Sequence, residues 1–414
     1  CLGLSDCGPD DVFRTVSRRA VGQGIRFPLM NSSSDTEAGP QTVTYLSIDP
    51  LSSTVGFSQV LAYVERMFQR GVGVDLVTLE HASDPALFER LASRGVQWRP
   101  QRYGRRGPAG SLGRVLRASF AIRGATVVHA RSDLAAASAM LAGIDRWLWD
   151  VRSLWVDQKV ASGVIRAGSF QERVMRWVER RAAWRSAAVV ALTESAISEL
   201  DCRYGEVVSP KARVVTTCTD LERFGVSPLP ELPLRVLLAG TLNSYYDVPA
   251  MLDLISELRR RRPIEFIVAS PEDTAWETEL ERAEAVRISA TPEEMVDLVS
   301  SCHVGLSLCR DDAGPSLLAA MPTKVGEFLA SGRPVVVNPG LIDAAGFVER
   351  YKCGLVFGRT TSVSTEAAVD QLELLLADPM TPERCRSLAE AQFDLEWGVD
   401  QLVETYSSLI ENSG

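Results

Sequence analysis

The chain has 414 residues, of which 46% are apolar and 23% are charged, and its formal net charge is −9. This length indicates two or three domains, and the acidic balance argues against nucleic acid as the principal partner. The eight cysteines show no Cys-x-x-Cys spacing, which argues against a zinc site or a disulfide framework and is typical of reduced cytosolic thiols.

Residues 1–41 precede the first predicted strand and lack the charged-then-apolar order of a signal peptide. Their polar stretch 31–40 (NSSSDTEAGP) predicts a disordered N-terminal segment. Met30 is the only methionine of this segment and is a candidate start of the natural chain. No apolar run approaches the about 18 residues that a membrane-spanning helix needs. The sequence therefore predicts a cytoplasmic protein.

The first half opens with an apolar strand at 42–48, a loop that contains Gly56, a helix at 58–70 and a second strand at 74–79. This order is that of a Rossmann-type unit, but a single glycine stands where dinucleotide-binding folds have G-x-G-x-x-G. Two interpretations of Gly56 stay open. The loop either approaches a ligand closely or makes a tight turn that needs a small residue.

The stretch from Arg94 to Arg123 contains eight arginines and no acidic residue. Aromatic residues and leucines are interleaved with the arginines: Trp98, Tyr103, Leu112, Leu116 and Phe120. One interpretation is a solvated basic face. The other is a surface for anionic lipid headgroups or for an acceptor that carries a diphosphate, which would place the protein at the membrane surface.

A short strand at 125–129 ends at His129, and Arg131 follows two residues later. Ligands of open parallel sheets bind at the carboxyl ends of the strands, and a guanidinium group there suits a diphosphate. His129 is either a ligand contact or a satisfied core residue. Asp150 and Arg152 follow the next strand in an apolar segment, where an internal ion pair is one interpretation.

The segment 227–233 (SPLPELP) has three prolines and predicts a linker. It separates an N-terminal domain at 42–226 from a C-terminal domain at 234–396. The second domain opens with a strand at 234–239 and the loop GTLNSYYD, and a last amphipathic helix is predicted at 397–411.

The stretch 321–337 (MPTKVGEFLASGRPVVV) predicts a helix with both ends marked. Pro322 suits the first helical position, and Gly332 suits the left-handed residue just past the end. Apolar residues at i, i+3 and i+4 form a buried stripe: Val325, Phe328 and Leu329.

Lys324 and Glu327 share another face of this helix, beside the apolar stripe. A solvent-facing Lys–Glu pair is the simplest interpretation. The helix follows a strand and a loop, however, and helix N-termini in that setting hold phosphates because free N–H groups and the helix dipole point there.

The order Pro-Thr-Lys-x-x-Glu-Phe-Leu-Ala-Ser-Gly-x-Pro-Val-Val resembles the donor-binding helix of family 4 glycosyltransferases of GT-B architecture. The resemblance implies that Glu327 binds the ribose hydroxyls of a nucleotide-sugar. It also implies that the amides of Thr323 and Lys324 face the diphosphate. Many members have a second glutamate eight residues earlier, where this chain has Ala319, so we interpret the chain as a variant branch.

The resemblance covers residues 42–411. Many family members clamp the diphosphate with Arg and Lys in the loop after the strand at 234–239. This chain is similar to a branch without the clamp and has Gly240, Thr241 and Tyr246 there, which leaves more of the phosphate charge to Lys324.

The family has His-x-His or His-x-Arg at the place of His129 and Arg131, and one of these residues contacts the donor. The resemblance further implies that the loop of Gly56 approaches the donor. Asp150 and Arg152 resemble a segment that lines the acceptor cleft.

The predicted fold is α/β, of GT-B type, with two Rossmann-like domains that face a central cleft and a last helix that crosses back to the first domain. The implied function is transfer of a sugar from a nucleotide-sugar donor to an acceptor, with retention and without a metal or other cofactor. The acceptor is a glycan, a lipid-linked molecule or a small molecule. Lys324, Arg131 and His129 are the candidate catalytic residues.

Two alternatives remain open. One is a nucleotide-sugar epimerase of the same fold, and the other is a non-catalytic nucleotide-sugar-binding partner of another glycosyltransferase. The expected location is the cytoplasm, with peripheral contact at the inner face of the membrane through Arg94–Arg123.

Overall fold

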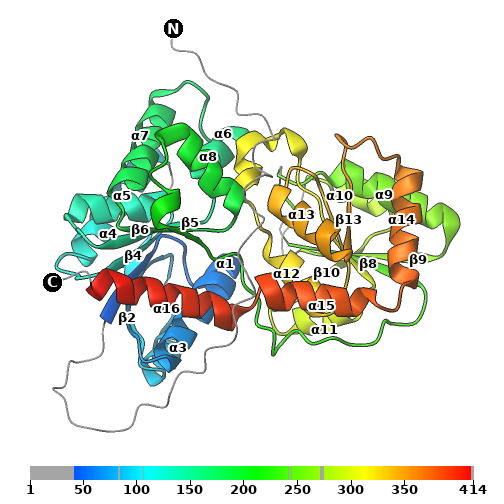
Figure 1. The fold of residues 1–414 in the computed structure, drawn as a ribbon, viewed down its shortest axis with the longest axis horizontal. Coiled ribbons are helices and arrows are strands. Elements are labelled where there is room, and N and C mark those ends of the chain that lie inside the picture. Colours follow the sequence, from blue (N-terminus) through cyan, green and yellow to red (C-terminus); the bar gives the residue numbers. More distant parts are fainter. Residues whose placement is uncertain are drawn as a thin grey trace.

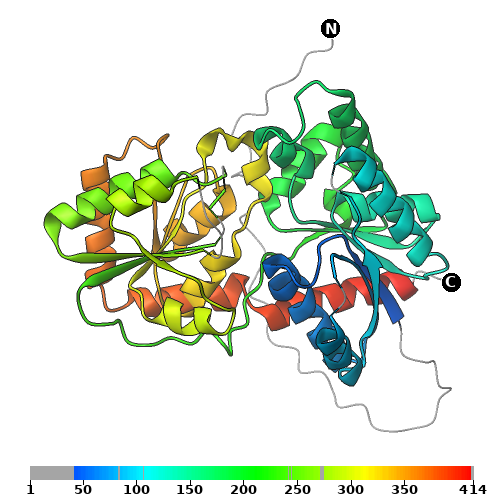
Figure 2. The same ribbon diagram turned by 180° about the vertical axis from the view of Figure 1, so that it is seen from behind.

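The computed structural model describes residues 42–82, 84–105, 107–240, 242–243, 245–270 and 275–411. The predicted N-terminal segment 1–41 lies outside them. Two parallel β-sheets with helices packed on them lie side by side, one from each half of the chain (Figures 1 and 2). The predicted α/β architecture of two Rossmann-like units is therefore confirmed.

The first unit has a seven-stranded parallel sheet in the order β3-β2-β1-β4-β5-β6-β7. Its strands are β1 (Thr42–Ser47), β2 (Gly73–Glu80), β3 (Gln97–Arg102), β4 (Val128–Arg131), β5 (Trp147–Val151), β6 (Ala188–Ala191) and β7 (Ala212–Val214). Its helices and turns are α1 (Thr54–Gly56), η2 (Phe57–Leu61), α2 (Ala62–Gln69), α3 (Pro85–Ser93), α4 (Pro108–Ala121), α5 (Asp133–Ala142), α6 (Trp155–Ala161), α7 (Phe170–Arg185), α8 (Glu194–Tyr204) and η3 (Ser209–Lys211).

The second unit has a six-stranded parallel sheet in the order β10-β9-β8-β11-β12-β13. Its strands are β8 (Leu234–Ala239), β9 (Ile264–Ala269), β10 (Val286–Ile288), β11 (Val304–Ser307), β12 (Val335–Val337) and β13 (Gly354–Val356). Its helices are α9 (Val248–Arg261), α10 (Glu277–Arg282), α11 (Glu294–Ser300), η4 (Asp311–Ala319), α12 (Thr323–Ala330), α13 (Ile342–Tyr351), α14 (Thr365–Ala377) and α15 (Thr381–Gln392).

Both faces of each sheet are buried, and successive residues of one strand point into different cores. In β1, Leu46 belongs to one core cluster and its neighbour Tyr45 to another. In β8, Leu237 and Leu238 are divided between two clusters in the same way. This double burial explains why the strands read as continuous apolar runs and not as alternating patterns.

The last helix, α16 (Leu395–Glu411), follows the second unit in sequence but packs on the first (Figure 1). Leu402 and Tyr406 of this helix lie in one core cluster with Met67 of α2. The helix begins two residues before the predicted start at 397. The end of the chain thus ties the two units together.

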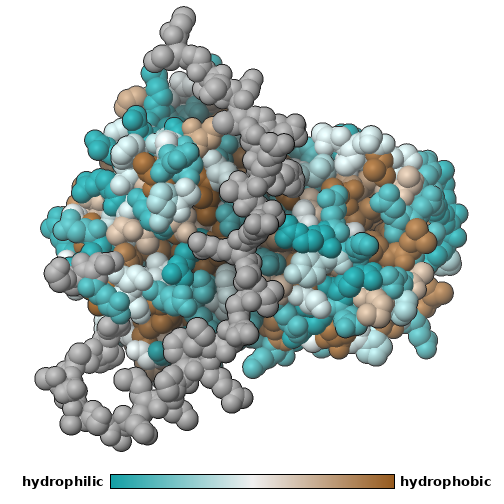
Figure 3. All heavy atoms as spheres, viewed as in Figure 1, coloured by the Kyte–Doolittle hydropathy of each residue, from teal (hydrophilic) through white to brown (hydrophobic). Residues whose placement is uncertain are grey.

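Among the described residues, no helix is long and apolar enough to span a bilayer. Figure 3 shows hydrophilic and hydrophobic residues interspersed over the face in view.

Candidate functional site

Helix α12 begins where η4 ends, between the two units. Pro322 is the residue just before the first helical residue, one position earlier than predicted, and its carbonyl accepts the N–H of Val325 at 3.0 Å. Gly332 has a φ of 74°, and the N–H of Arg333 reaches back to the carbonyl of Phe328 at 2.8 Å, which closes the last turn.

The predicted apolar stripe fixes this helix on the second sheet. Its members are fully buried: Val325, Phe328 and Leu329. A Cβ at Gly305 of β11 would lie 2.2 Å from the Phe328 ring, so the strand needs a glycine where this ring packs. The N-terminal turn is therefore held rigidly at the junction of the two units.

Lys324 projects from this turn towards the end of β8. Its Nζ donates to the Tyr246 hydroxyl at 3.0 Å and lies 4.2 Å from the centre of the same ring. Gly240 has a φ of 113°, and a Cβ there would lie 3.5 Å from Nζ of Lys324. The structure thus brings Lys324, Tyr246 and Gly240 together, while Thr241 lies outside the described residues.

Glu327 lies almost one turn further along α12 and is half-buried. Burial raises the pKa of this carboxyl to about 7, although the nearby charges of Lys324 and Arg223 act in the opposite direction. Among the described residues, its carboxylate has no hydrogen-bond partner. It is therefore an available acceptor for the hydroxyl groups of a ligand.

Arg131, at the carboxyl end of β4, lies opposite this helix. One guanidinium nitrogen donates to Asp49 at 2.5 Å and another donates to Oε1 of Gln59 at 2.8 Å. Arg152 donates to the same Gln59 oxygen at 3.2 Å. Nε of each arginine is buried without a hydrogen-bond partner in the described part of the chain, and Arg131 as a whole is only 2% exposed.

Gln59 connects these arginines to α12, because its Nε2 donates to Oγ1 of Thr323 at 3.0 Å. The sequence alone does not single out Gln59. Gln59 lies in the first helical turns after β1, where a polar residue is also expected on a solvent-facing side. No local sequence signal therefore marks Gln59 as part of a site. The guanidinium groups of Arg131 and Arg152 and the N-terminal turn of α12 therefore all contact the amide of Gln59.

His129 points away from this junction into the first core. One ring nitrogen lies 2.7 Å from the Tyr406 hydroxyl, the other lies 3.1 Å from Asp150, and the ring stacks on Tyr45. Burial, above all, lowers its pKa. Because both nitrogens are occupied, the geometry favours the core interpretation of His129 over direct ligand contact.

Asp150 and Arg152 form an internal ion pair, which was one interpretation of the sequence. Oδ1 of Asp150 lies 3.5 Å from Nη1 of Arg152. Burial alone would raise the pKa of Asp150, but the Arg152 charge and the His129 hydrogen bond outweigh it and hold that pKa at about 2. Asp150 is almost fully buried, so it stabilises the neighbouring cations and has little surface for an acceptor.

Gly56 is accounted for by packing. A Cβ at this position would lie 2.1 Å from the carbonyl oxygen of Pro50, so only glycine allows α1 to approach the preceding loop this closely. The tight-turn interpretation is sufficient to explain the residue.

Ala319 is fully buried and belongs to the core of the first unit, together with Trp149 and Ile197. Its segment, η4, packs against α6 and α8. Thr193 donates to the carbonyl of Leu318 at 2.5 Å and reinforces the contact. A carboxylate at position 319 would therefore be desolvated in this arrangement, which gives a physical reason for alanine there.

Residues 58–239 match the family model described as a glycosyl transferase 4-like domain. No curated protein matches the chain.

Solved structures match over most of the chain at low identity. The sucrose-phosphate synthase of Thermosynechococcus elongatus is 16% identical with a TM-score of 0.66, over 90% of this chain and 100% of that chain. A glycosyltransferase of Rickettsia africae is 12% identical with a TM-score of 0.64, over 90% and 99%. HepE of Anabaena, in complex with UDP-glucose, is 15% identical with a TM-score of 0.63, over 89% and 99%. These likenesses show the GT-B fold.

Proposed function

We propose, from the premise that the chain is a GT-B glycosyltransferase with a glycosyl transferase 4-like domain, that it transfers a sugar from a nucleoside diphosphate sugar with retention and without a metal ion. The observation that carries this proposal is that Gln59 connects Arg131 and Arg152 of the first unit to Thr323, in the N-terminal turn of α12 that also carries Lys324. Cations from both units beside a helix N-terminus form a setting for a diphosphate.

The role proposed for each residue follows from where negative charge develops during the reaction. Negative charge grows on the diphosphate as the bond to the sugar breaks, and Lys324, Arg131 and the amides of the first helical turn lie where they can stabilise it. Glu327 accepts hydrogen bonds from the ribose hydroxyls. Catalysis is then mainly electrostatic and positional, and it needs no nucleophile from the protein.

The amide of Gln59 occupies the space between the arginines and Thr323. A bound diphosphate offers stronger, charged acceptors than this amide does. We expect the donor to replace some of the Gln59 hydrogen bonds to Arg131 and Arg152.

The first experiment compares how far UDP and GDP raise the melting temperature. HepE is solved with UDP-glucose, which makes UDP-glucose the first donor to assay. A turnover assay with a panel of nucleotide-sugars separates the alternatives. Sugar transfer supports the proposal, an isomerised donor supports an epimerase, and nucleotide binding without turnover supports a non-catalytic partner. Retained turnover in EDTA would support the metal-independent mechanism.

The expected place of action is the cytoplasmic face of a membrane, with an acceptor that is lipid-linked. The residues that support a membrane location and a lipid-linked acceptor lie in the first unit, in the part of the stretch Arg94–Arg123 that follows Arg99.

A further inference from the structure

The arginine-rich stretch Arg94–Arg123 divides into two parts in the structure. Arg94 pairs with Glu65 at 2.7 Å, and Nε of Arg99 donates to Asp75 at 2.6 Å. The arginines after Arg99 differ from these two. In the described part of the chain, no carboxylate lies within ion-pair distance of Arg102, Arg105, Arg114, Arg117 or Arg123. The positive charge of the stretch is therefore neutralised at its beginning and not at its end.

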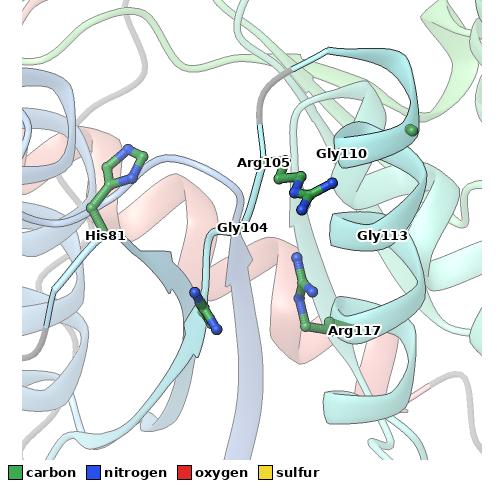
Figure 4. Close-up of a pocket in the computed structure, with 8 residues that line it drawn as sticks. His81, Gly104, Arg105, Gly110, Gly113 and Arg117 are labelled. Atoms are coloured by element: carbon green, nitrogen blue, oxygen red, sulfur yellow. The ribbon is translucent and has the colours of Figure 1, made fainter.

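Three of these arginines line a cavity of about 660 Å³ beside α4. Arg102 ends β3, Arg105 lies in the following loop, Arg117 comes from α4, and His81 follows β2. Figure 4 shows Arg105 and Arg117 on the α4 side of this space and His81 on the opposite side. Among the described residues, the guanidinium groups of Arg102 and Arg105 make no hydrogen bond.

The loop before α4 is built to hold this arrangement. Arg117 donates to the carbonyl of Tyr103 at 3.1 Å, and Arg114 donates to the carbonyl of Arg105 at 2.8 Å. Gly104 has a φ of 80°, and a Cβ there would lie 2.5 Å from the Arg117 guanidinium. A Cβ at Gly110 would lie 1.8 Å from the Arg105 carbonyl oxygen. The glycines thus let the loop approach α4 and place cationic groups around an open space.

An exposed apolar stripe runs along α4 next to the cavity. Its members are spaced four residues apart and expose 61%, 42% and 60% of their surface: Leu112, Leu116 and Phe120. At 3.6 residues per turn, this stripe neighbours the face that carries Gly113 and Arg117 into the cavity. Exposed large apolar residues in a row beside a cationic cavity favour a ligand that has both an anionic and a hydrocarbon part.

The cavity lies at the same edge of the sheet as Arg131. Arg102 and Arg131 end parallel strands of the sheet order β3-β2-β1-β4, three strand spacings apart. At about 4.8 Å per spacing, the two strand ends are roughly 14 Å apart. An anion bound in the cavity would therefore lie at the same sheet edge as Arg131, within a molecule's length of the candidate donor site.

We propose that this cavity binds the phosphate or diphosphate group of a lipid-linked acceptor and that the hydrocarbon part of the acceptor lies along Leu112, Leu116 and Phe120. The proposal rests on the proposed glycosyltransferase function and names the class of its acceptor. Arg94 and Arg99, whose charges are paired with Glu65 and Asp75, do not line this cavity.

The test uses the double variant Arg102→Ala/Arg105→Ala, whose side chains make no hydrogen bond in the described structure and whose loss should leave the fold intact. The matched control is Arg173→Ala/Arg180→Ala, which removes the same charge from two exposed positions of α7. Binding is measured to phosphatidylcholine vesicles with and without phosphatidic acid. Calorimetry with inorganic pyrophosphate, at saturating nucleotide to occupy the donor site, measures the soluble anion.

We expect the wild type and the control to bind the phosphatidic acid vesicles and the cavity variant to bind them at least tenfold more weakly. Leu112→Ser/Phe120→Ser should weaken vesicle binding and leave pyrophosphate binding unchanged. Equal losses in the cavity variant and the control would mean diffuse charge and would overturn the proposal. Pyrophosphate binding without vesicle binding would overturn the lipid part.

The melting-temperature rise with UDP or GDP is measured on the same proteins, so that the two proposals fail separately. A wild type that shows no rise contradicts the proposed function. A wild type that shows the rise but no cavity-dependent vesicle binding contradicts only the acceptor inference.

Discussion

Gln59 and Thr323 are 264 positions apart in sequence, yet the Gln59 amide donates to the Thr323 hydroxyl at 3.0 Å and joins the two units at the candidate site. The carbonyl oxygen of the same amide accepts from both Arg131 and Arg152. One neutral side chain therefore links two guanidinium groups of the first sheet to the helix start of the second. Mutations of the charged residues near Gln59 can be interpreted in terms of these hydrogen bonds.

Arg131→Ala should lower turnover at least tenfold, which corresponds to about 1.4 kcal/mol of lost transition-state stabilisation. The reason is that its guanidinium group lies at the strand end opposite α12 and is linked to the first turn of that helix through Gln59. Steady-state kinetics with the identified donor measures the effect. Arg131→Lys, which keeps the charge but not the planar fork, should lose less.

Because Arg131 also holds Asp49, the melting temperature of Arg131→Ala must be recorded alongside the kinetics. Near-normal turnover in a folded Arg131→Ala protein would remove this residue from the site.

Glu327→Gln should weaken the binding of free nucleotide and of donor roughly tenfold to a hundredfold, because a hydrogen bond to a charged group is worth about 1.5–3 kcal/mol. The ribose is the same in the ground state and the transition state, so kcat should change less than affinity. Calorimetry with the nucleotide measures the change. Glu383→Gln, at an exposed position of α15, is the matched control. Unchanged affinity in Glu327→Gln would remove Glu327 from the nucleotide site.

The pKa of Glu327, about 7, predicts a pH dependence of nucleotide binding. As pH rises through 7 the carboxyl loses its proton and becomes the stronger acceptor, so wild-type affinity should rise relative to that of Glu327→Gln between pH 6 and 8, about one unit on either side of that pKa. The ratio of the two proteins cancels the titration of the nucleotide itself. A constant ratio would show that the carboxyl does not titrate in this range.

The same shift makes the opposite prediction for stability without nucleotide. Burial raises the folded-state pKa of Glu327 above its ordinary value of 4.5, so the stabilising contribution is fully present below pH 4.5 and is lost as pH rises to about 7. The melting temperature of the wild type relative to that of Glu327→Gln should therefore fall as pH rises over this interval. Identical slopes in the two proteins would contradict the shift.

The sequence predicted the elements whose cause is local. The spacing of Val325, Phe328 and Leu329 and the left-handed Gly332 define α12 within a single stretch, and the structure places all of them as expected. Pro322 was placed one position too late, which is within the ordinary uncertainty of helix ends.

The missed features depend on contacts between distant parts of the chain. Gln59 meets Thr323 and His129 meets Tyr406 only after both sheets and the last helix have assembled. The burial of Ala319 in the core of the other unit is of the same kind. No residue pattern near any of these positions reveals whether the side chain faces solvent or meets a partner that is more than a hundred residues away in the sequence.

Lys324→Met should lower kcat more than it weakens nucleotide binding. The substitution keeps a long apolar stem on the Tyr246 ring but removes the ammonium group, whose interaction with the diphosphate grows as the sugar bond breaks. We expect kcat to fall roughly tenfold to a hundredfold and nucleotide affinity to fall by less, as measured by steady-state kinetics and calorimetry.

Tyr246→Phe is the matched variant for this last prediction, because it keeps the ring below Lys324 and removes only the hydroxyl that accepts from Nζ at 3.0 Å. If the ammonium acts on the diphosphate, freeing it from the hydroxyl should leave kcat within a few-fold of the wild type. If Lys324 serves only to hold Tyr246 in the loop after β8, both variants should lose affinity and turnover to a similar extent. Parallel losses would therefore assign Lys324 to packing, whereas a selective fall of kcat in Lys324→Met would place its charge in the transition state.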